Sequence, residues 1–197
     1  MSENNAIMQG GSVTESCVLQ ISDLHKSYGS HPVLEGVSFS IPRGKIVGLL
    51  GPNGCGKSTI MKMISGLLPA DNGSILIDGH LPGLVSKSIV SYLPERTYLN
   101  DWMKVSEVLQ FFSDFYADFD LERAQQMLAD LHLSPNTRLK TMSKGTKEKV
   151  QLILVMSRRA QLYLLDEPIG GVDPAAREYI LNTILKNFDE SSSILIT

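Results

Sequence analysis

The chain has 197 residues, enough for one domain with a sizeable hydrophobic core. Hydrophobic residues make up 43% and charged residues 20%, which excludes a disordered chain, and two cysteines are too few for a disulfide framework. With 18 basic and 21 acidic residues the net charge is -3, so composition does not indicate broad electrostatic binding to nucleic acid or to acidic membranes. We therefore expect no nucleic-acid partner and a reducing compartment.

The first half of the chain alternates between strand and helix patterns. Residues 1–16 are polar and are predicted to be a flexible tail. No segment has the roughly 20 consecutive apolar residues that a membrane span requires. Alternating apolar residues predict an edge strand over 18–24 and a second strand over 33–41, and an apolar run predicts a fully buried strand of a parallel sheet over 45–50. A helix from 57 to about 68 and strands over 74–78 and 89–93 follow.

The second half contains a helical, aromatic-rich stretch before the strand and helix alternation resumes. A helix is predicted from Ser143 to about residue 159, a buried strand over 162–165, a helix that begins at Asp173-Pro174, and a strand over 193–196. The predicted fold class is therefore α/β, with a parallel-sheet core, an antiparallel edge sheet and a helical insertion. We predict a single domain over 17–197, with a core formed by 17–93 and 143–197 and a helical subdomain over about 94–142.

A glycine-rich segment between the buried strand and its helix has the spacing of a phosphate-binding loop. Glycines let backbone N–H groups converge on phosphate oxygens, and the helix N-terminus favours an anion. Lys57 is predicted to neutralise the β and γ phosphates, and the Ser58 hydroxyl to ligate Mg2+. The residues predicted to bind nucleotide here are Gly51, Pro52, Asn53, Gly54, Cys55, Gly56, Lys57, Ser58 and Thr59.

Two carboxylates follow the apolar run at 162–165. The carboxyl end of a parallel strand faces the ligand crevice, so Asp166 is predicted to hold Mg2+ and Glu167 to polarise the water that attacks the γ-phosphate. Alone, such a pair is more often a solvated strand end. Together with the phosphate loop, it indicates nucleotide hydrolysis.

These motifs, in this order and spacing, resemble the ATP-binding cassette (ABC) ATPases from about Val18 to Thr197. The resemblance makes the core a P-loop NTPase fold, residues 51–59 the Walker A motif and residues 162–167 the Walker B motif, with Glu167 as the catalytic residue. It places Tyr28 against the adenine of ATP and Asp173 in the D-loop. The cofactors implied are ATP and Mg2+.

The chain departs from the family pattern in two places. The signature Leu-Ser-Gly-Gly-Gln is represented by residues 142–146, where Ser143, Lys144 and Gly145 are implied to contact ATP bound to the other protomer of a dimer. Ser143 is also suited to cap a helix, which is the plainer interpretation. Glu95 stands where most members have the glutamine of the Q-loop, and its oxygen is predicted to reach Mg2+ or a water ligand of the ion. Both variants resemble those of exporter ATPase subunits.

The family's switch histidine would follow the last predicted strand, and the chain ends there at Thr197. We therefore expect this chain to be truncated just before that histidine, to bind nucleotide, and to hydrolyse it slowly.

The resemblance implies the ATP-hydrolysing subunit of a transporter, with export favoured. It implies a separate transmembrane permease subunit, a second ATPase protomer, and a cytoplasmic location on the inner face of the membrane. The alternative is a non-transport ABC ATPase that acts as a switch in DNA repair or translation. Most aromatic residues of the insertion are expected to form its small core, with Tyr98 and Trp102 the better candidates for docking a membrane subunit.

Overall fold

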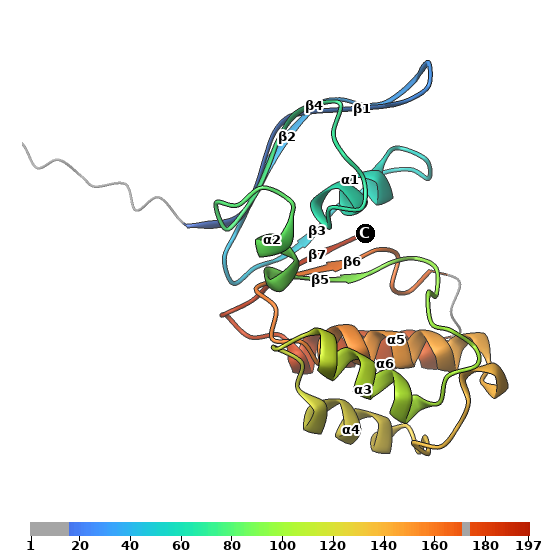
Figure 1. Cartoon of the computed structure of the whole chain (residues 1–197). Helices are drawn as coiled ribbons and strands as arrows, with labels where there is room; N and C mark the ends of the chain where they lie inside the picture. The colour runs from blue at the N-terminus through green and yellow to red at the C-terminus, as the bar shows by residue number, and fades with distance from the viewer. Residues whose placement is uncertain (1–15, 171–173) are drawn as a thin grey trace, which may run out of the picture.

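The computed structural model describes residues 16–170 and 174–197, apart from the side chains of residues 175 and 176. It contains two sheets (Figure 1). The first is antiparallel in the order β2-β1-β4 and consists of β1 (Cys17–Tyr28), β2 (His31–Pro42) and β4 (Asn72–Ile77). The second is parallel in the order β3-β7-β6-β5 and consists of β3 (Ile46–Gly48), β5 (Val90–Leu93), β6 (Leu162–Leu165) and β7 (Ser193–Ile196). The mixed architecture confirms the predicted fold class.

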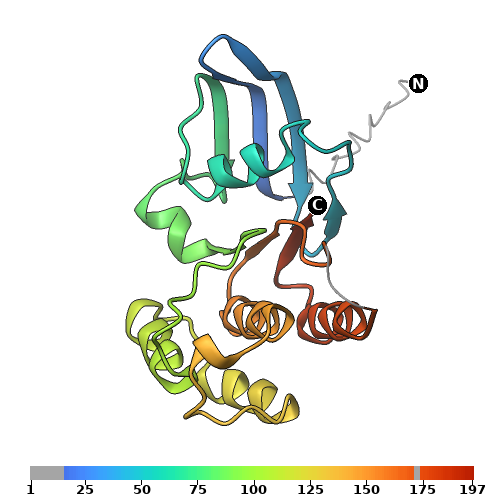
Figure 2. The same cartoon turned by 90° about the vertical axis from the view of Figure 1, so that its right-hand side faces the viewer.

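Helices separate the two sheets and cover the outer face of the parallel one. Helix α1 (Lys57–Ile64) lies between the sheets, and α2 (Leu84–Ile89) precedes β5. Helices α5 (Lys144–Met156) and α6 (Pro174–Asn187) lie against the parallel sheet, with α3 (Val105–Phe115) and α4 (Leu121–Asp130) beyond them (Figure 2). A short 3-10 helix, η1 (Leu139–Thr141), leads into α5. The layers are therefore antiparallel sheet, α1, parallel sheet and two helical layers.

Each face of the parallel sheet belongs to a separate apolar cluster. Leu162, Leu164 and Leu195 pack with α1 and the antiparallel sheet, whereas Tyr163, Leu165 and Ile194 pack with α3 to α6. Alternate residues of β6 thus serve opposite clusters, and all four residues of the strand are buried. This two-sided burial explains why β6 has a continuous apolar sequence.

Side-chain oxygens accept hydrogen bonds from backbone N–H groups at the starts of several helices. The Ser143 Oγ accepts a hydrogen bond from the Thr146 N–H at 3.1 Å, which confirms the predicted cap of α5. The Asp120 Oδ1 accepts from the Arg123 N–H at 3.0 Å at the start of α4, and the Lys104 N–H donates to Glu107 Oε2 at 2.8 Å at the start of α3. Capping therefore fixes where the insertion helices begin.

Several sequence predictions of local structure are wrong. Residues 18–24 are not an edge strand, because β1 pairs with β2 on one side and β4 on the other. The strand predicted over 45–50 is shorter and lies at the sheet edge, where Ile46 is 43% exposed. Helix α1 ends at Ile64 rather than near residue 68, and α2 was not predicted. Between 94 and 142 the chain is helical only in α3, α4 and η1. The non-helical segments between these helices are therefore longer than the sequence pattern predicts.

The aromatic residues of the insertion divide between core and surface. Phe112 is buried and contacts Tyr116 and Phe119 with ring centroids at 5.5 and 5.7 Å, as a small core requires. Phe111 and Phe115 stack on each other at 4.6 Å on the exposed side of α3, against the expectation of burial. Tyr98 and Trp102 are exposed, and their docking role stays a prediction. The predicted domain boundaries likewise stay predictions.

Arg158 joins the insertion to the core. Its side chain is 4% exposed, and its Nε lies 3.1 Å from Asp118 Oδ1. The guanidinium also lies over the Tyr116 ring at 4.0 Å from the centroid and donates to the backbone carbonyls of Lys87, Ser88 and Val90. One buried cation therefore satisfies carbonyls of the core and a carboxylate of the insertion.

We expect Arg158→Met to lower the free energy of unfolding by about 3 kcal/mol, because it leaves buried acceptors without their donor. Chemical denaturation measures this loss. The matched control is Arg159→Met, since the Arg159 side chain is 73% exposed and pairs only at the surface with Asp120. Equal stability of the two variants would contradict the assignment of Arg158 as the connection.

No helix within the described ranges is long and apolar enough to cross a membrane.

Candidate nucleotide site

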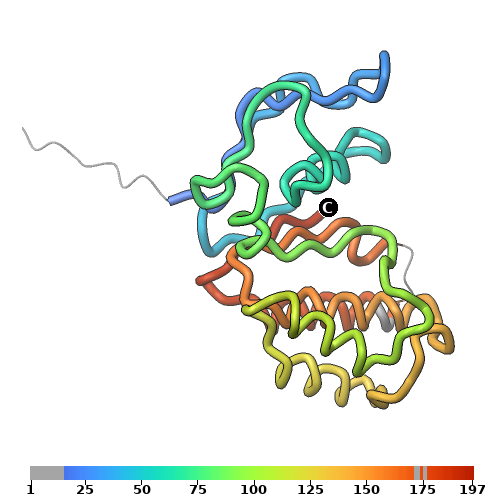
Figure 3. The backbone as a smooth tube through the Cα atoms, in the orientation of Figure 1, coloured from blue at the N-terminus to red at the C-terminus, as the bar shows by residue number. Residues whose placement is uncertain are grey.

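The site lies where the four parallel strands end. Gly48 of β3 is level with Ile196 of β7, which is level with Leu165 of β6, which is level with Leu93 of β5. Parallel pairing in this register brings the residues that follow each strand to one edge of the sheet. The phosphate loop, the segment with Glu95, the Asp166-Glu167 pair and Thr197 therefore share that edge, and the backbone trace in Figure 3 shows the chain end beside α1.

The phosphate loop depends on the close approach of Gly56 to strand β2. Gly56 has a φ of 96° and precedes α1. A Cβ atom at this position would lie 2.7 Å from the Leu34 side chain and 3.1 Å from that of Val33. Both the left-handed backbone and the contact therefore require glycine. The loop then enters α1, whose first N–H groups have no partner within the helix and can face an anion.

The Lys57 side chain lies along this loop. Its Nζ donates to the backbone carbonyls of Gly51 at 2.9 Å and Pro52 at 3.0 Å. Cys55 is exposed, and a Cβ at Gly51 would lie 2.7 Å from its sulfur, so the thiol lies close to Gly51. The ammonium group is thus held at the loop by two neutral acceptors.

Asp166 is a buried carboxylate held by hydroxyl groups. It is 1% exposed. Its Oδ1 accepts from Ser58 Oγ at 2.9 Å and from Thr197 Oγ1 at 3.2 Å, and its Oδ2 accepts from the Tyr92 hydroxyl at 3.3 Å. Burial, followed by the Asp166 charge, raises the pKa of Tyr92, so the phenol stays a donor at neutral pH. No basic side chain in the described part of the chain pairs with Asp166.

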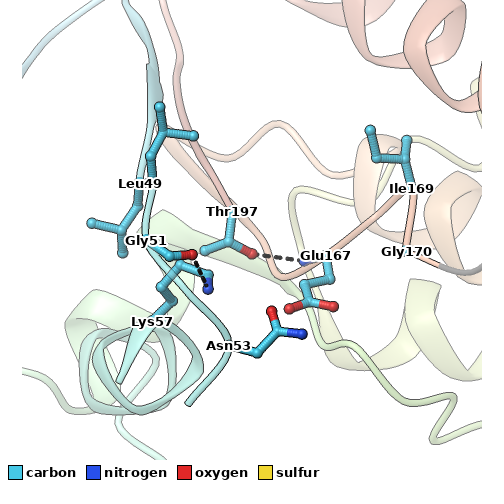
Figure 4. Close-up of a pocket in the computed structure, with 9 residues that line it drawn as sticks. Leu49, Gly51, Asn53, Lys57, Glu167, Ile169, Gly170 and Thr197 are labelled. Carbon is cyan, nitrogen blue, oxygen red and sulfur yellow. Dashed lines mark hydrogen bonds between the residues drawn. The ribbon is translucent and has the colours of Figure 1, made fainter. Parts of the chain in front are cut away.

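Glu167 is fixed through its backbone. Its N–H donates to Thr197 Oγ1 at 2.8 Å, and its carbonyl accepts from the Gly170 N–H at 3.0 Å. Its φ of 49° is unusual for a residue with a side chain and indicates local strain. Figure 4 shows Glu167, Asn53, Lys57 and Thr197 around one pocket of about 270 Å3. The predicted base and the predicted phosphate-binding lysine therefore meet in the same cavity.

Two further predicted elements line a neighbouring cleft. Glu95 and Lys144 border it together with Glu167, so the segment after β5 and the start of α5 face the site from the helical side. The Lys144 side chain is 82% exposed and lies 3.7 Å from Glu148. Ser143 and Gly145 stand at the same end of α5.

The remaining predicted residues are not brought to this pocket by a described contact. Tyr28 ends β1 at the hairpin tip, where it pairs with His31, and is 50% exposed. Thr59 is buried in the first turn of α1. Asp173 lies outside the described residues.

Sequence reasoning missed Tyr92 and Thr197 as site residues. Both contact Asp166, and Thr197 also holds Glu167. A hydroxyl residue at or just after a strand has no distinctive spacing, so neither stood out. The available signal was position, since Tyr92 lies in a strand, and Thr197 follows a strand, predicted to end beside the carboxylate pair.

Residues 34–170 match the family model described as ABC transporter. The chain belongs to the ABC transporter family. It is 33% identical over 187 residues to the linearmycin resistance ATP-binding protein LnrL of Bacillus subtilis, covering 91% of the chain and 60% of LnrL. It is 34% identical over 186 residues to the SkfA peptide export ATP-binding protein SkfE of the same organism, covering 91% of the chain and 78% of SkfE.

A solved structure described as the ATP binding subunit of an ABC transporter superposes with a TM-score of 0.81 at 30% identity, covering 91% of the chain and 79% of that structure. The fold is thus that of the ABC ATP-binding proteins, and nucleotide binding follows from the family. The chain spans 60% of the length of LnrL and 78% of that of SkfE.

We expect Thr197→Val to lower the free energy of unfolding by about 1–3 kcal/mol, because it leaves the Glu167 N–H without its acceptor and removes one donor from Asp166. Thr197→Ser keeps the hydroxyl and should retain most of the stability. Thermal or chemical unfolding of the three proteins measures the difference. A valine variant as stable as the serine variant would contradict the role of the hydroxyl.

Proposed function

We propose that this chain binds MgATP and hydrolyses it as the ATPase subunit of an ABC transporter. The observation that carries the proposal is the pocket at the strand ends, where Lys57 of the phosphate loop and Glu167 of the acidic pair line one cavity. A phosphate chain placed there has a cation and helix α1 on one side and a carboxylate on the other.

The oxygen atoms present fit Mg2+. Ser58 supplies a hydroxyl, and Asp166 supplies a carboxylate 2.9 Å away. Mg2+ prefers oxygen ligands, and it keeps several waters and phosphate oxygens rather than using an all-protein cage. Ser58 would bind the ion directly, Asp166 would hold it directly or through water, and Glu95, which lines a pocket together with Asp166, would supply a further oxygen. When bound, the ion would neutralise charge on the β and γ phosphates.

Glu167 is the proposed general base. The positive φ and the Thr197 hydroxyl fix its backbone, and its carboxylate lies in the same pocket as Lys57. A carboxylate held there can accept a proton from water as the water attacks phosphorus. Asp166 already accepts hydrogen bonds from three hydroxyl groups, so it is less available to accept the proton of the attacking water.

The second protomer and the membrane subunit are proposed from the family. Lys144 is exposed at the start of α5, which suits a role of Ser143, Lys144 and Gly145 toward ATP on another protomer. Tyr28 and Asp173 are proposed for adenine stacking and the D-loop. We propose a transmembrane permease as the second partner and a position on the inner face of the membrane. SkfE is a peptide export protein by name, which supports export as the direction.

We expect Lys57→Ala to weaken MgATP binding about 100-fold, because the charge-assisted hydrogen bonds to phosphate are lost. Titration with a fluorescent ATP analogue measures the Kd. Lys62→Ala removes an exposed lysine from the last turn of the same helix and should bind like the parent. Tight binding by Lys57→Ala would refute the assignment of the phosphate loop.

We expect Glu167→Gln to retain MgATP binding and to lower ATP turnover by about 100-fold to 10000-fold, the usual contribution of a general base. Single-turnover hydrolysis measures the rate. Glu178→Gln, an exposed change on α6, is the control. Parent-like turnover in Glu167→Gln would exclude this carboxylate as the base.

A further inference from the structure

A polar cavity lies at the edge of the parallel sheet opposite the nucleotide pocket. It has a volume of about 360 Å3 and is formed by the start of α4, the end of α6 and the residues just before β6 and β7. Since β6 and β7 are parallel, their first residues share this edge, whereas the nucleotide pocket lies where the strands end. Apart from Ala160, every residue that lines the cavity has a polar side chain. The cavity is therefore separate from the proposed ATP site and differs from it in chemical character.

Arg123 lines this cavity and keeps one end of its guanidinium group unoccupied. Its Nε donates to Asn187 Oδ1 at 2.8 Å, and its Nη2 donates to the Asn187 carbonyl at 3.1 Å. Nε and Nη2 form one side of the planar group, so the end formed by Nη1 and Nη2 still has donors for another acceptor. No carboxylate in the described part of the chain forms an ion pair with Arg123. Arg123 is therefore a cation that neutral acceptors hold in a fixed orientation.

Asp189 is the corresponding anion of the cavity. Its Oδ1 accepts from the Ser191 N–H at 2.8 Å and from the Ser191 hydroxyl. These hydrogen bonds, and after them the charge of Arg123, lower the pKa of the Asp189 carboxyl, so it is ionised at neutral pH. An ionised carboxylate has about four acceptor sites, so Asp189 can take further donors. Among the described residues, no basic side chain pairs with it.

Arg123 and Asp189 line the same cavity without forming an ion pair with each other. The other two charged residues of the lining neutralise each other, since Arg159 Nη2 lies 3.0 Å from Asp120 Oδ2. One cation and one anion therefore remain, each fixed by neutral partners beside an open volume. A ligand that carries both a carboxylate and an ammonium group would satisfy the two charges together.

We propose that this cavity binds a small zwitterion of the amino-acid type, whose carboxylate meets the unoccupied end of the Arg123 guanidinium and whose ammonium group meets Asp189. An arginine suits a planar carboxylate because two parallel N–H groups can bind its two oxygens. A volume of about 360 Å3 lies within the range of small-molecule sites. The proposal goes beyond the proposed function and does not depend on it, because no residue lines both this cavity and the nucleotide pocket.

A zwitterion fits these surroundings better than an ion of a single sign. A phosphate or a simple carboxylate would bring negative charge close to Asp189, and a simple cation would bring positive charge close to Arg123. Each of these ions would gain one attraction and suffer one repulsion, whereas a zwitterion gains two attractions. Because Asn187 and Ser191 already hold the two charged groups, little side-chain entropy is lost when the ligand binds.

A titration of the isotope-labelled parent protein, followed by nuclear magnetic resonance, tests the binding. The zwitterionic probes are glycine, β-alanine and γ-aminobutyrate, which carry the two charges at increasing separation, and acetate and ethylammonium are the probes of one charge. We expect at least one zwitterion to shift the Arg123 Nε–H and Ser191 N–H signals with a Kd on the order of 1 mM, and each single-charge probe to bind at least about tenfold more weakly. No shift with any zwitterion up to about 100 mM, or acetate binding as tight as that of the best zwitterion, would overturn the proposal.

Asp189→Asn tests the ammonium side of the site, because it keeps an acceptor for Ser191 and removes the negative charge. We expect the variant to bind the best zwitterion at least about tenfold more weakly and to bind acetate as well as or better than the parent. The matched control is Glu190→Gln, which makes the same change of net charge at the neighbouring exposed residue, outside the cavity lining, and should bind like the parent.

Parent-like binding of the zwitterion by Asp189→Asn, or an equal loss in Glu190→Gln, would exclude Asp189 as the partner of the ammonium group. The amide spectrum of each variant reports its fold in the same experiment. The comparison of zwitterions with single-charge probes on the parent decides the proposal even if a variant is unfolded.

Discussion

The burial of the Asp166 carboxylate is the constraint on which the rest of the site depends. A charge that is 1% exposed is tolerated only if its oxygen atoms are hydrogen-bonded, and no cation of the described residues pairs with it. Three hydroxyl groups perform this role, from α1, from β5 and from the residue after β7. Because these donors come from separate elements, the site forms only when all of them are packed in register. A one-residue slip of β5 would turn Tyr92 to the opposite face of the sheet.

The parts of the fold predicted correctly are those encoded locally. Strands β6 and β7 were placed at their observed bounds because each is a short apolar run between polar residues, and the Ser143 cap is a single-residue signal. The wrong predictions concern which strands lie next to each other in a sheet. Whether β1 is central or β3 lies at an edge is decided by strand pairing, which periodicity does not contain. For the same reason the phosphate loop and the acidic pair were recognisable, whereas the hydroxyls of Tyr92 and Thr197 required the folded sheet.

Two residues of the α5 segment hold the chain before and after β5 by different chemistry. Just beyond the end of the helix, Arg158 binds carbonyls before and within β5 and the Asp118 carboxylate. In the middle of the helix, Gln151 donates to the Pro94 carbonyl after β5. Residues of one helical segment therefore hydrogen-bond to the chain at the start of β5 and just after its end, before Glu95. Arg158 makes several charge-assisted hydrogen bonds, whereas the Gln151 amide makes one long one, so Arg158 is the stronger of the two connections.

Backbone carbonyls of the phosphate loop hold the Lys57 ammonium group in place before phosphate binds. An ammonium group has three donors, and two are taken by the carbonyls of Gly51 and Pro52. These contacts hold a long, flexible side chain along the loop and so reduce the conformational entropy that binding would otherwise cost. They also leave one donor directed elsewhere. Phosphate oxygens are stronger acceptors than carbonyls because they are charged. The loop therefore orients its lysine with weak acceptors, which a phosphate can displace or supplement, while Glu167 stays apart on its own strained backbone in the same pocket.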